Sequence, residues 1–214
     1  MTPRKVLVFG ASGTLGSACV LELKQHGFET VPVGRDLSIL KNVGKIDGAV
    51  WAQGMNFTGK FADTSGEAWD EIWDANFTYI VKALDLLLAQ ESFNEGARLV
   101  VISSVWQELT RAEKVAYIAT KAAVGGLVRG LAADLGSEGI SINAVLPGVI
   151  DSPMTEKNLS PEQISGIESA TPGGKLASSE EVAEVVAFLI DRKSSGINGQ
   201  SIIVDRGWSI TRNV

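Results

Sequence analysis

Tyr117 and Lys121 stand four residues apart in the stretch AYIATKAA, which otherwise consists mostly of small residues. On a helix, residues i and i+4 lie on one face, one turn apart. A nearby ammonium group favours the ionised form of a phenol, whose reference pKa is about 10. The spacing therefore indicates either a proton donor tuned towards neutral pH or an ordinary surface pair, and the motif alone does not choose between them.

A glycine-rich turn follows the first apolar strand, in the segment VFGASGTLGSACV. Such a turn lets backbone N–H groups approach a pyrophosphate, and the helix N-terminus adds a favourable partial charge. The spacing differs from G-x-G-x-x-G, so the turn predicts either a dinucleotide site or a tight strand-to-helix connection. The candidate phosphate-binding residues are Gly10, Ser12, Gly13, Thr14, Leu15 and Gly16.

The second strand ends in VGRD. In dinucleotide-binding folds a carboxylate at this place binds the ribose 2′-hydroxyl of NAD, whereas an arginine accommodates the 2′-phosphate of NADP. Gly34 occupies the carboxylate position and Arg35 follows it, which favours NADP(H). NAD(H) stays possible, because the neighbouring Asp36 could hold the ribose, and a solvated Arg-Asp pair is a third interpretation.

Short apolar strands alternate with longer amphipathic segments along the chain. Strands are expected at residues 5–10, 28–34, 47–54, 97–104, 140–148 and 199–207. Helices are expected at residues 15–25, 67–90, 112–135 and 179–191, the last capped by Ser178 or Ser179. The alternation predicts one doubly wound α/β domain over residues 1–214, Rossmann-like, with a parallel sheet covered by helices on both faces.

Residues 151–177 interrupt this pattern with three prolines, three glycines and many polar residues. The segment is too long for a plain connector, so it is either disordered or a lid on the substrate side. A short helix is expected within residues 154–169, capped by Ser160 with Pro161 at its first position.

Composition narrows the classes of partner. The net charge is −6 and no cluster of Lys and Arg stands out, which argues against nucleic-acid binding. The single cysteine, Cys19, excludes an internal disulfide, and no His/Cys/Asp cluster has the spacing of metal ligands. The N-terminal apolar run is too short for a signal peptide and no run approaches membrane-spanning length, so a cytoplasmic protein without a membrane partner is expected.

Taken in order, these segments resemble the short-chain dehydrogenase/reductase family over nearly the whole chain. GASGTLG resembles the cofactor-binding turn of the family, and WAQG stands where the family usually has Asn-Asn-Ala-Gly. DANFTYI resembles the segment that contains the active-site asparagine of the family, which is Asn76 in this chain. VVISSVW resembles the strand that ends in the catalytic serine. Ser104 lies thirteen residues before Tyr117, the familiar interval, and is therefore preferred to Ser103. YIATK matches Tyr-x-x-x-Lys, and NAVLPGVIDSPM resembles the Pro-Gly segment beside the nicotinamide.

The resemblance implies an oxidoreductase that transfers a hydride between NAD(P)(H) and a carbonyl or alcohol, a small-molecule substrate. It implies that Tyr117 is the general acid/base, while Lys121 lowers the pKa of the phenol and holds the nicotinamide ribose. Ser104 would bind the substrate oxygen, and Asn76 would hold a water that links Lys121 to solvent. Further cofactor contacts are expected from Ala52, Gln53, Gly54, Pro147, Gly148, Val149 and Ser152. The substrate pocket is expected to include Ser104, Trp106 and Met154.

The sequence departs from the family pattern in two places. The usual glycine spacing would put a glycine at position 14, where this chain has Thr14 after Gly13. Only eighteen residues lie between Arg35 and Gly54, where the family typically has a helix and another strand. The segment DLSILKNVGKID compresses that unit, so its first two residues, Asp36 and Leu37, are expected near the adenine.

Two other functions stay open at this point. The chain could be a catalytically silent dinucleotide-binding sensor or scaffold of the same fold, or a family member that uses its cofactor for epimerisation or dehydration. The resemblance also implies a homo-dimer or homo-tetramer, in which the long helices near residues 68–90 and 112–135 pack against copies of themselves.

Overall fold

A computed structural model describes residues 3–194 and 196–211. Its strands are β1 (Lys5–Phe9), β2 (Glu29–Val33), β3 (Ile46–Trp51), β4 (Phe93–Ile102), β5 (Ser141–Pro147) and β6 (Ser201–Val204). They form one parallel sheet in the order β2-β1-β3-β4-β5-β6. The helices are α1 (Thr14–Gln25), α2 (Gly66–Trp73), α3 (Tyr79–Ala89), α4 (Val115–Leu135), α5 (Pro153–Asn158), α6 (Pro161–Ala170) and α7 (Ser179–Ile190).

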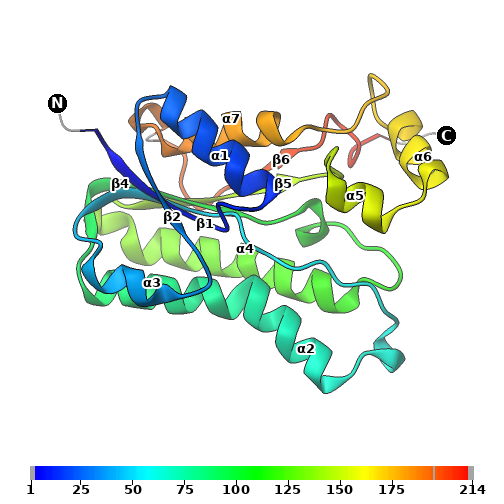
Figure 1. Cartoon of the computed structure of the whole chain (residues 1–214), viewed down its shortest axis with the longest axis horizontal. Coiled ribbons are helices and arrows are strands. Elements are labelled where there is room, and N and C mark those ends of the chain that lie inside the picture. Colours follow the sequence, from blue (N-terminus) through cyan, green and yellow to red (C-terminus); the bar gives the residue numbers. More distant parts are fainter. Residues whose placement is uncertain (1–2, 195, 212–214) are drawn as a thin grey trace.

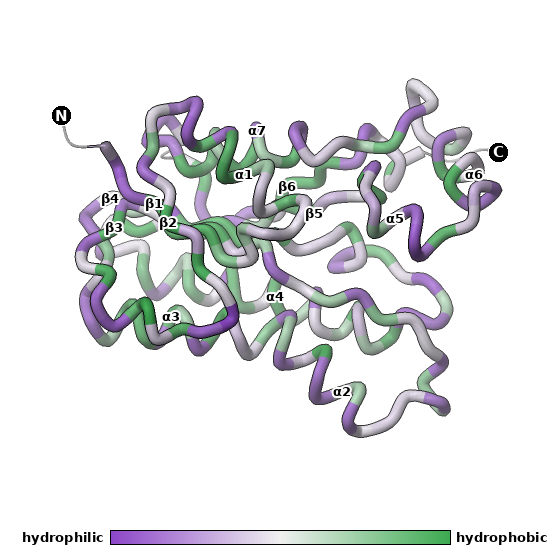
Figure 2. Tube along the Cα trace, viewed as in Figure 1, coloured by the Kyte–Doolittle hydropathy of each residue, from purple (hydrophilic) through white to green (hydrophobic). Residues whose placement is uncertain are grey.

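Helices cover both faces of the sheet, as Figure 1 shows: α1 and α7 lie on one side, and α3 and α4 on the other. Alternate residues of β4 enter the two cores, with Leu99 under α3 and α4 and Val100 under α1 and α7. Because both faces are covered, the strands are apolar throughout, and Figure 2 shows them as the hydrophobic layer between the helices. The predicted doubly wound parallel sheet is confirmed.

The register of the sheet brings the carboxyl ends of its strands to one edge. Phe9 pairs with both Val33 and Trp51, and Trp51 pairs with Val101. The residues that follow β1, β2, β3 and β4 therefore emerge side by side. The chain runs outwards from β1 to β2 and then returns to β3, so the strand order reverses between β1 and β3. Open α/β sheets bind ligands in the crevice at such a switch point.

The glycine turn places α1 directly against the end of β1. Gly10 has a φ of +73°, and its N–H donates to the carbonyl of Val33. A Cβ on Gly16 would lie 2.1 Å from the Gly10 carbonyl oxygen, far inside van der Waals contact. Gly13 has a φ of −80°, and a Cβ there would meet the same oxygen only at 3.4 Å. The turn therefore needs glycine at positions 10 and 16, while position 13 has room for a side chain.

The compressed segment after β2 forms only a short 3-10 helix, η1 (Leu37–Asn42), before β3 begins. No further strand joins the sheet in the described residues, so β2 is an edge strand. This confirms that the helix-and-strand unit expected from the family is shortened.

The predicted helix over residues 67–90 is interrupted. α2 leads into a π-helical turn, η3 (Asp74–Thr78), which is followed by α3. A π turn inserts an extra residue into the hydrogen-bond ladder, and such turns occur frequently at functional sites. Hydrophobic periodicity does not reveal the insertion, because both flanking segments keep the helical pattern.

Residues 151–177 contain two helices, α5 and α6, which Figure 1 places beyond the end of the sheet towards which β5 runs. The predicted cap is confirmed for α6, where Ser160 and Gln163 form a capping box and Pro161 is the first helical residue. α5 begins at Pro153 with Ser152 as its cap. For α7 the cap is Ser178, which forms a second capping box with Glu181.

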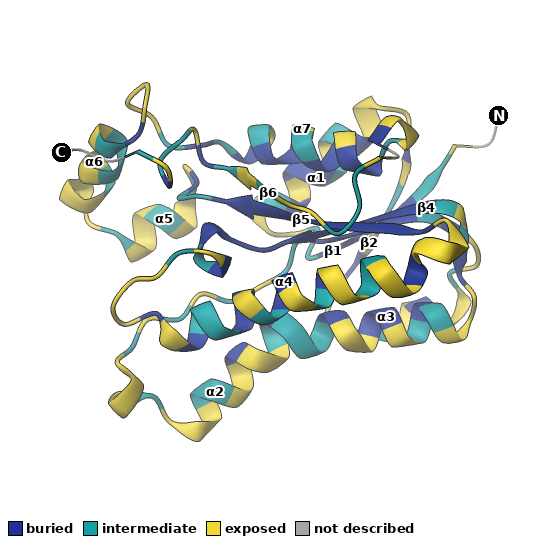
Figure 3. Ribbon diagram, turned by 180° about the vertical axis from the view of Figure 1, so that it is seen from behind, coloured by how far each residue is buried: buried dark blue, intermediate teal, exposed yellow. Residues whose placement is uncertain are grey.

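The expectation that no apolar stretch approaches membrane-spanning length is wrong for α4. Together with η5 (Gly136–Glu138) it gives a helical stretch, Val115–Glu138, that by length and composition could cross a bilayer, the one such stretch among the described residues. In the fold this helix packs against the sheet, with Thr120, Lys121 and Val124 buried. Figure 3 shows that its outer side is exposed.

Gly16→Ala is expected to lower the free energy of unfolding by about 1–3 kcal/mol, because the added methyl group overpacks the turn. Gly13→Ser is the matched control and should be neutral or slightly stabilising, because serine is a better N-cap than glycine. Urea unfolding of the two variants checks both values. Equal stability of the two proteins would contradict the steric role of Gly16.

Candidate active site

Tyr117 lies in the first turns of α4 and faces the residues that follow β4. Its hydroxyl interacts with the Ser104 side chain, and the residue keeps partial exposure to solvent. Ser104 follows the end of β4 and caps the short helix η4 (Val105–Gln107), where its Oγ accepts from the Trp106 N–H at 3.3 Å. The neighbouring Ser103 is buried, and its hydroxyl has no partner among the described residues. The structure thus brings Ser104, rather than Ser103, to the phenol.

Lys121 lies one turn further along α4, with its Nζ 5.5 Å from the centre of the Tyr117 ring. Its side chain is almost fully buried, and burial lowers the pKa of the ammonium group to about 8. Burial also raises the pKa of Tyr117 to about 12, although the hydrogen bond with Ser104 opposes the shift. Among the protein's own groups, desolvation dominates the pKa of Tyr117, and the expected lowering of that pKa by Lys121 stays a prediction.

Asn76 sits in the π turn and joins three segments. Its Oδ1 accepts from the Met55 N–H at 2.7 Å, and its Nδ2 donates to the Met55 carbonyl at 3.0 Å and to Thr120 Oγ1 at 3.1 Å. A Cβ on Gly54 would lie 3.1 Å from Asn76 Oδ1 and 3.6 Å from Lys121 Nζ. The amide thus fixes the segment after β3 against α4, and its oxygen can accept a second hydrogen bond.

Lys114 is a site residue that the sequence does not reveal. It precedes α4 and is buried, with its Nζ 5.7 Å from the centre of the Tyr117 ring. The ammonium donates to Asn56 Oδ1 at 2.7 Å, to the Phe57 carbonyl at 2.9 Å and to Thr58 Oγ1 at 2.6 Å. The one available signal is its place three residues before Tyr117, a spacing that also occurs in any solvated helix.

The residues at the carboxyl ends of β1 and β3 offer groups that suit a dinucleotide. The N-terminus of α1 has no side-chain cap and no acidic residue in its first turn, so its backbone N–H groups and partial positive charge are free for an anion. Ser12 and Thr14 are exposed there, while Leu15 packs on the core. Gln53 lies across Gly10, and both polar atoms of its side chain are buried without a partner among the described residues.

The segment after β2 offers one unengaged charge. Asp36 caps η1, with Oδ1 accepting from the Ser38 N–H at 2.8 Å and Oδ2 from the Ser38 hydroxyl at 2.7 Å, and these bonds lower its pKa. Leu37 is partly buried and packs on the core under α3. Arg35 is exposed and forms no ion pair within the described residues.

The segment after β5 closes the other side of the crevice. Gly148 donates its N–H to the Val204 carbonyl, and a Cβ there would lie 2.6 Å from Asp205 Cβ, so Pro147, Gly148 and Val149 are held close to the end of β6. Ser152 Oγ accepts from the Thr155 N–H at 3.3 Å as the cap of α5.

An aromatic pair stands next to this segment. Trp106 packs edge-to-face on Trp208, with ring centres 5.9 Å apart. Met154 of α5 is 57% exposed. In the WAQG segment, Trp51 is wholly buried and stacks on Phe9 with ring centres 5.0 Å apart, whereas Ala52 is only partly buried.

Lys121→Met is expected to stabilise the protein, and more so at pH 7 than at pH 10. The ammonium pKa is about 8 in the folded chain and near its ordinary value, 10.5, in the unfolded chain. Below pH 8 both states bind the proton, and burying the charge costs about 3 kcal/mol. Between pH 8 and pH 10.5 only the unfolded state binds this proton, so the free energy of unfolding of the wild type rises with pH. The stabilisation by Lys121→Met relative to the wild type therefore falls to about 1 kcal/mol at pH 10.

Urea unfolding at both pH values measures this difference. Lys24→Met, at an exposed position of α1, is the matched control and should show little change with pH. A gain for Lys121→Met that is the same at pH 7 and pH 10 would contradict the burial of the charge.

Comparisons with known proteins identify the family of the chain. Residues 37–209 match the family described as Enoyl-(Acyl carrier protein) reductase. The Uncharacterized oxidoreductase YmfI of Bacillus subtilis (strain 168) is 31% identical over 175 residues, which cover 82% of this chain and 72% of that protein. Gluconate 5-dehydrogenase of Gluconobacter oxydans (strain 621H) is 29% identical over 205 residues, covering 95% of this chain and 78% of that protein.

Among solved structures, the ligand-free aldohexose dehydrogenase (AldT) of Thermoplasma acidophilum has a TM-score of 0.89 and 25% sequence identity, over 99% of this chain and 96% of that chain. The family match covers well over half of the chain, and the likeness to the solved structure covers nearly all of it. The chain therefore belongs to the short-chain dehydrogenase/reductase family and is an NAD(P)(H)-dependent oxidoreductase that acts on an alcohol/carbonyl pair.

Proposed function

We propose that Tyr117 is the general acid/base of this oxidoreductase, that Ser104 binds the substrate oxygen and that Lys121 and Asn76 support them. The observation that carries the proposal is the approach of the Ser104 side chain to the Tyr117 hydroxyl at the carboxyl edge of the sheet, with Lys121 buried one turn away. Two hydroxyl groups side by side can contact the same carbonyl oxygen.

The protonation of these groups suits carbonyl reduction. With a pKa raised to about 12, the phenol holds its proton at neutral pH and can donate it to the developing alkoxide. The nicotinamide supplies the hydride when bound. For alcohol oxidation, Tyr117 must first become a phenolate, which the positive charge of Lys121 at 5.5 Å favours. Asn76 and Thr120 hold the backbone around Lys121 in place.

We further propose that residues 1–214 form one domain and that this domain binds NADP(H) in preference to NAD(H). The unpaired, exposed Arg35 stands where a 2′-phosphate would lie, while both carboxylate oxygens of Asp36 are engaged by Ser38. The Gly10–Gly16 turn, Gln53 and the segment Pro147–Ser152 are the other residues assigned to the cofactor.

The proposed substrate is a carbonyl compound or alcohol with an apolar part. Trp106 lies beside the reacting hydroxyls and Met154 is exposed on α5, so residues 151–177 are assigned the role of a substrate-side lid. Gluconate and aldohexoses, which appear in the names of two related proteins, are the first compounds to assay. Members of the family generally form oligomers. We place the contact between copies of this chain on the exposed outer sides of α3 and α4, as a homo-dimer or homo-tetramer (Figure 3).

A catalytically silent sensor or scaffold remains the rival function, and no observation favours it. Such a protein has no need of two hydroxyls and a buried lysine together at the crevice. Burying Lys121 costs stability, and a chemical function explains why the chain keeps it.

Tyr117→Phe should lower kcat by about 10²–10⁴-fold, because it removes the proton donor. The measurement is nicotinamide absorbance with the best substrate from a panel of ketones, gluconate and aldohexoses. Tyr79→Phe removes the other tyrosine hydroxyl, which donates to the Gly34 carbonyl outside the reacting centre, and should keep near wild-type turnover. Turnover that persists in Tyr117→Phe would refute the acid/base assignment.

Arg35→Ala should weaken NADPH binding by about tenfold or more, the loss expected for a charge-assisted contact of about 1.5–3 kcal/mol, and leave NADH binding nearly unchanged. Fluorescence titration with both cofactors measures the effect. Asp36→Asn is the companion variant and should not weaken NADPH binding. Tighter binding of NADH than of NADPH by the wild-type protein would overturn the cofactor preference.

A further inference from the structure

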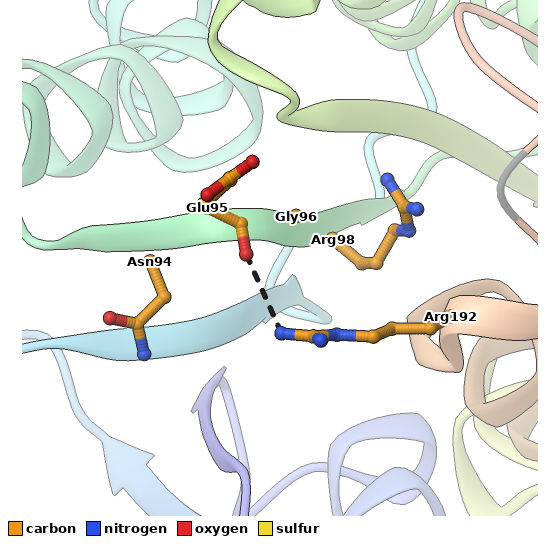
Figure 4. Close-up of a pocket in the computed structure, with 5 residues that line it drawn as sticks. All are labelled: Asn94, Glu95, Gly96, Arg98 and Arg192. Carbon is orange, nitrogen blue, oxygen red and sulfur yellow. Dashed lines mark hydrogen bonds between the residues drawn. The ribbon is translucent and has the colours of Figure 1, made fainter.

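Two arginines line an open pocket of about 660 Å³ at the amino end of the sheet. Asn94, Glu95, Gly96 and Arg98 of β4 form one wall, and Arg192 forms the other (Figure 4). Arg192 belongs to η6 (Arg192–Ser194), which follows α7. Arg98 precedes Ser104 by six residues, or about 20 Å of extended strand. The pocket is therefore separate from the crevice that holds Tyr117.

Both guanidinium groups lie on the α7 side of the sheet. Arg98 alternates with Ala97 and Leu99, which face α3 and α4, so it points to the opposite face. The Arg192 guanidinium lies over Gly96, since a Cβ there would be 3.9 Å from its Nε and 4.0 Å from its Cζ. The two positive charges interact, because Arg192 adds to the effect of burial in lowering the pKa of Arg98.

Arg98 is buried, and one of its N–H donors has no hydrogen-bond partner among the described residues. The residue is only 8% exposed, yet it lines the pocket. Nη1 donates to Ser141 Oγ at 3.0 Å, and Nε has no hydrogen-bond partner among the described residues. Leaving a buried donor of a charged group unpaired is costly, so the arrangement points to a missing acceptor.

No carboxylate in the described part of the chain pairs with either arginine. Glu95 offers Arg192 only its backbone carbonyl, at 3.5 Å from Nη2, and Figure 4 shows its carboxylate pointing away. Asp191 lies 3.7 Å from Arg4 and accepts from the Lys193 N–H. Asp47 is the third nearby acid.

Asp47 is engaged as well. One of its oxygens accepts from the Lys5 N–H at 2.8 Å, and the other accepts from Asn94 Nδ2 at 3.0 Å. Each acid near the pocket thus has another partner or faces away, and the acceptor for the two arginines must come from outside the described chain.

We propose that Arg98 and Arg192 form a binding site for a small oxyanion, either phosphate or a carboxylate group. The planar guanidinium fork matches the oxygens of both groups, and an anion between two guanidinium groups relieves their repulsion. The site is independent of the proposed function, because it lies at the other end of the sheet. Binding stabilises the fold, since it removes the cost of a buried and unpaired charge.

Isothermal titration calorimetry with sodium phosphate tests the site, at constant ionic strength and with NADPH both absent and saturating. Arg192→Gln removes one guanidinium at an exposed position, so the variant is expected to fold. Its phosphate affinity should fall by about tenfold or more under both conditions. Arg129→Gln, an exposed arginine on α4, removes the same charge elsewhere and should bind phosphate like the wild type.

Thermal unfolding gives a second readout. Phosphate at ten times its Kd should raise the Tm of the wild type and of Arg129→Gln by about 3 °C or more, and the Tm of Arg192→Gln much less. Sodium acetate in place of phosphate decides between the two anions. If acetate binds and its binding is weakened in Arg192→Gln, the site takes carboxylates as well as phosphate. If acetate does not bind, the site is restricted to phosphate. The proposal is overturned if the wild type binds neither anion, if Arg192→Gln binds as well as the wild type, or if Arg129→Gln loses as much affinity.

Discussion

The parallel register of β1, β3 and β4 is the constraint on which the site depends. Phe9, Trp51 and Val101 lie at the same level of three neighbouring strands, so the chain leaves all three strands at one edge. A shift by one residue would exchange the side chains that enter the two cores, which burial on both faces forbids. The burial of the apolar strands therefore fixes their register, and the register brings the glycine turn, Gly54 and Ser104 to the same edge of the sheet.

Close packing at this edge decides the electrostatics of the site. Lys121 and Lys114 are both buried around the Tyr117 ring, and burial lowers the pKa of each ammonium. Lys114 donates to three oxygens of residues 56–58, whereas Asn76 ties Met55 to Thr120. The segment after β3 is thus held against α4 by polar contacts made in a poorly solvated space, where an unpaired group would be costly.

The two ends of the sheet resemble each other in one respect. At the carboxyl end, the uncapped α1 and the buried amide of Gln53 offer unpaired polar groups to a ligand. At the amino end, the positively charged side chains of Arg98 and Arg192 line a pocket that could hold an anion. Arg206, by contrast, is paired within the chain: in a left-handed conformation, it donates two hydrogen bonds of 3.0 and 2.5 Å to Glu181.

The sequence by itself determined the alternation of strands and helices, the turn after β1 and the spacing of Tyr117 and Lys121, because these depend on local periodicity and on contacts within a helix. It also predicted the shortened unit before β3 and the cap of α6. Only the tertiary structure decided that Trp51 is buried in the core, that a π turn holds Asn76, and that Lys114 lies beside Tyr117. These outcomes, like the raised pKa of Tyr117, depend on which distant segments remove water from a group, and desolvation is a property of the packed fold that spacing along a chain does not contain.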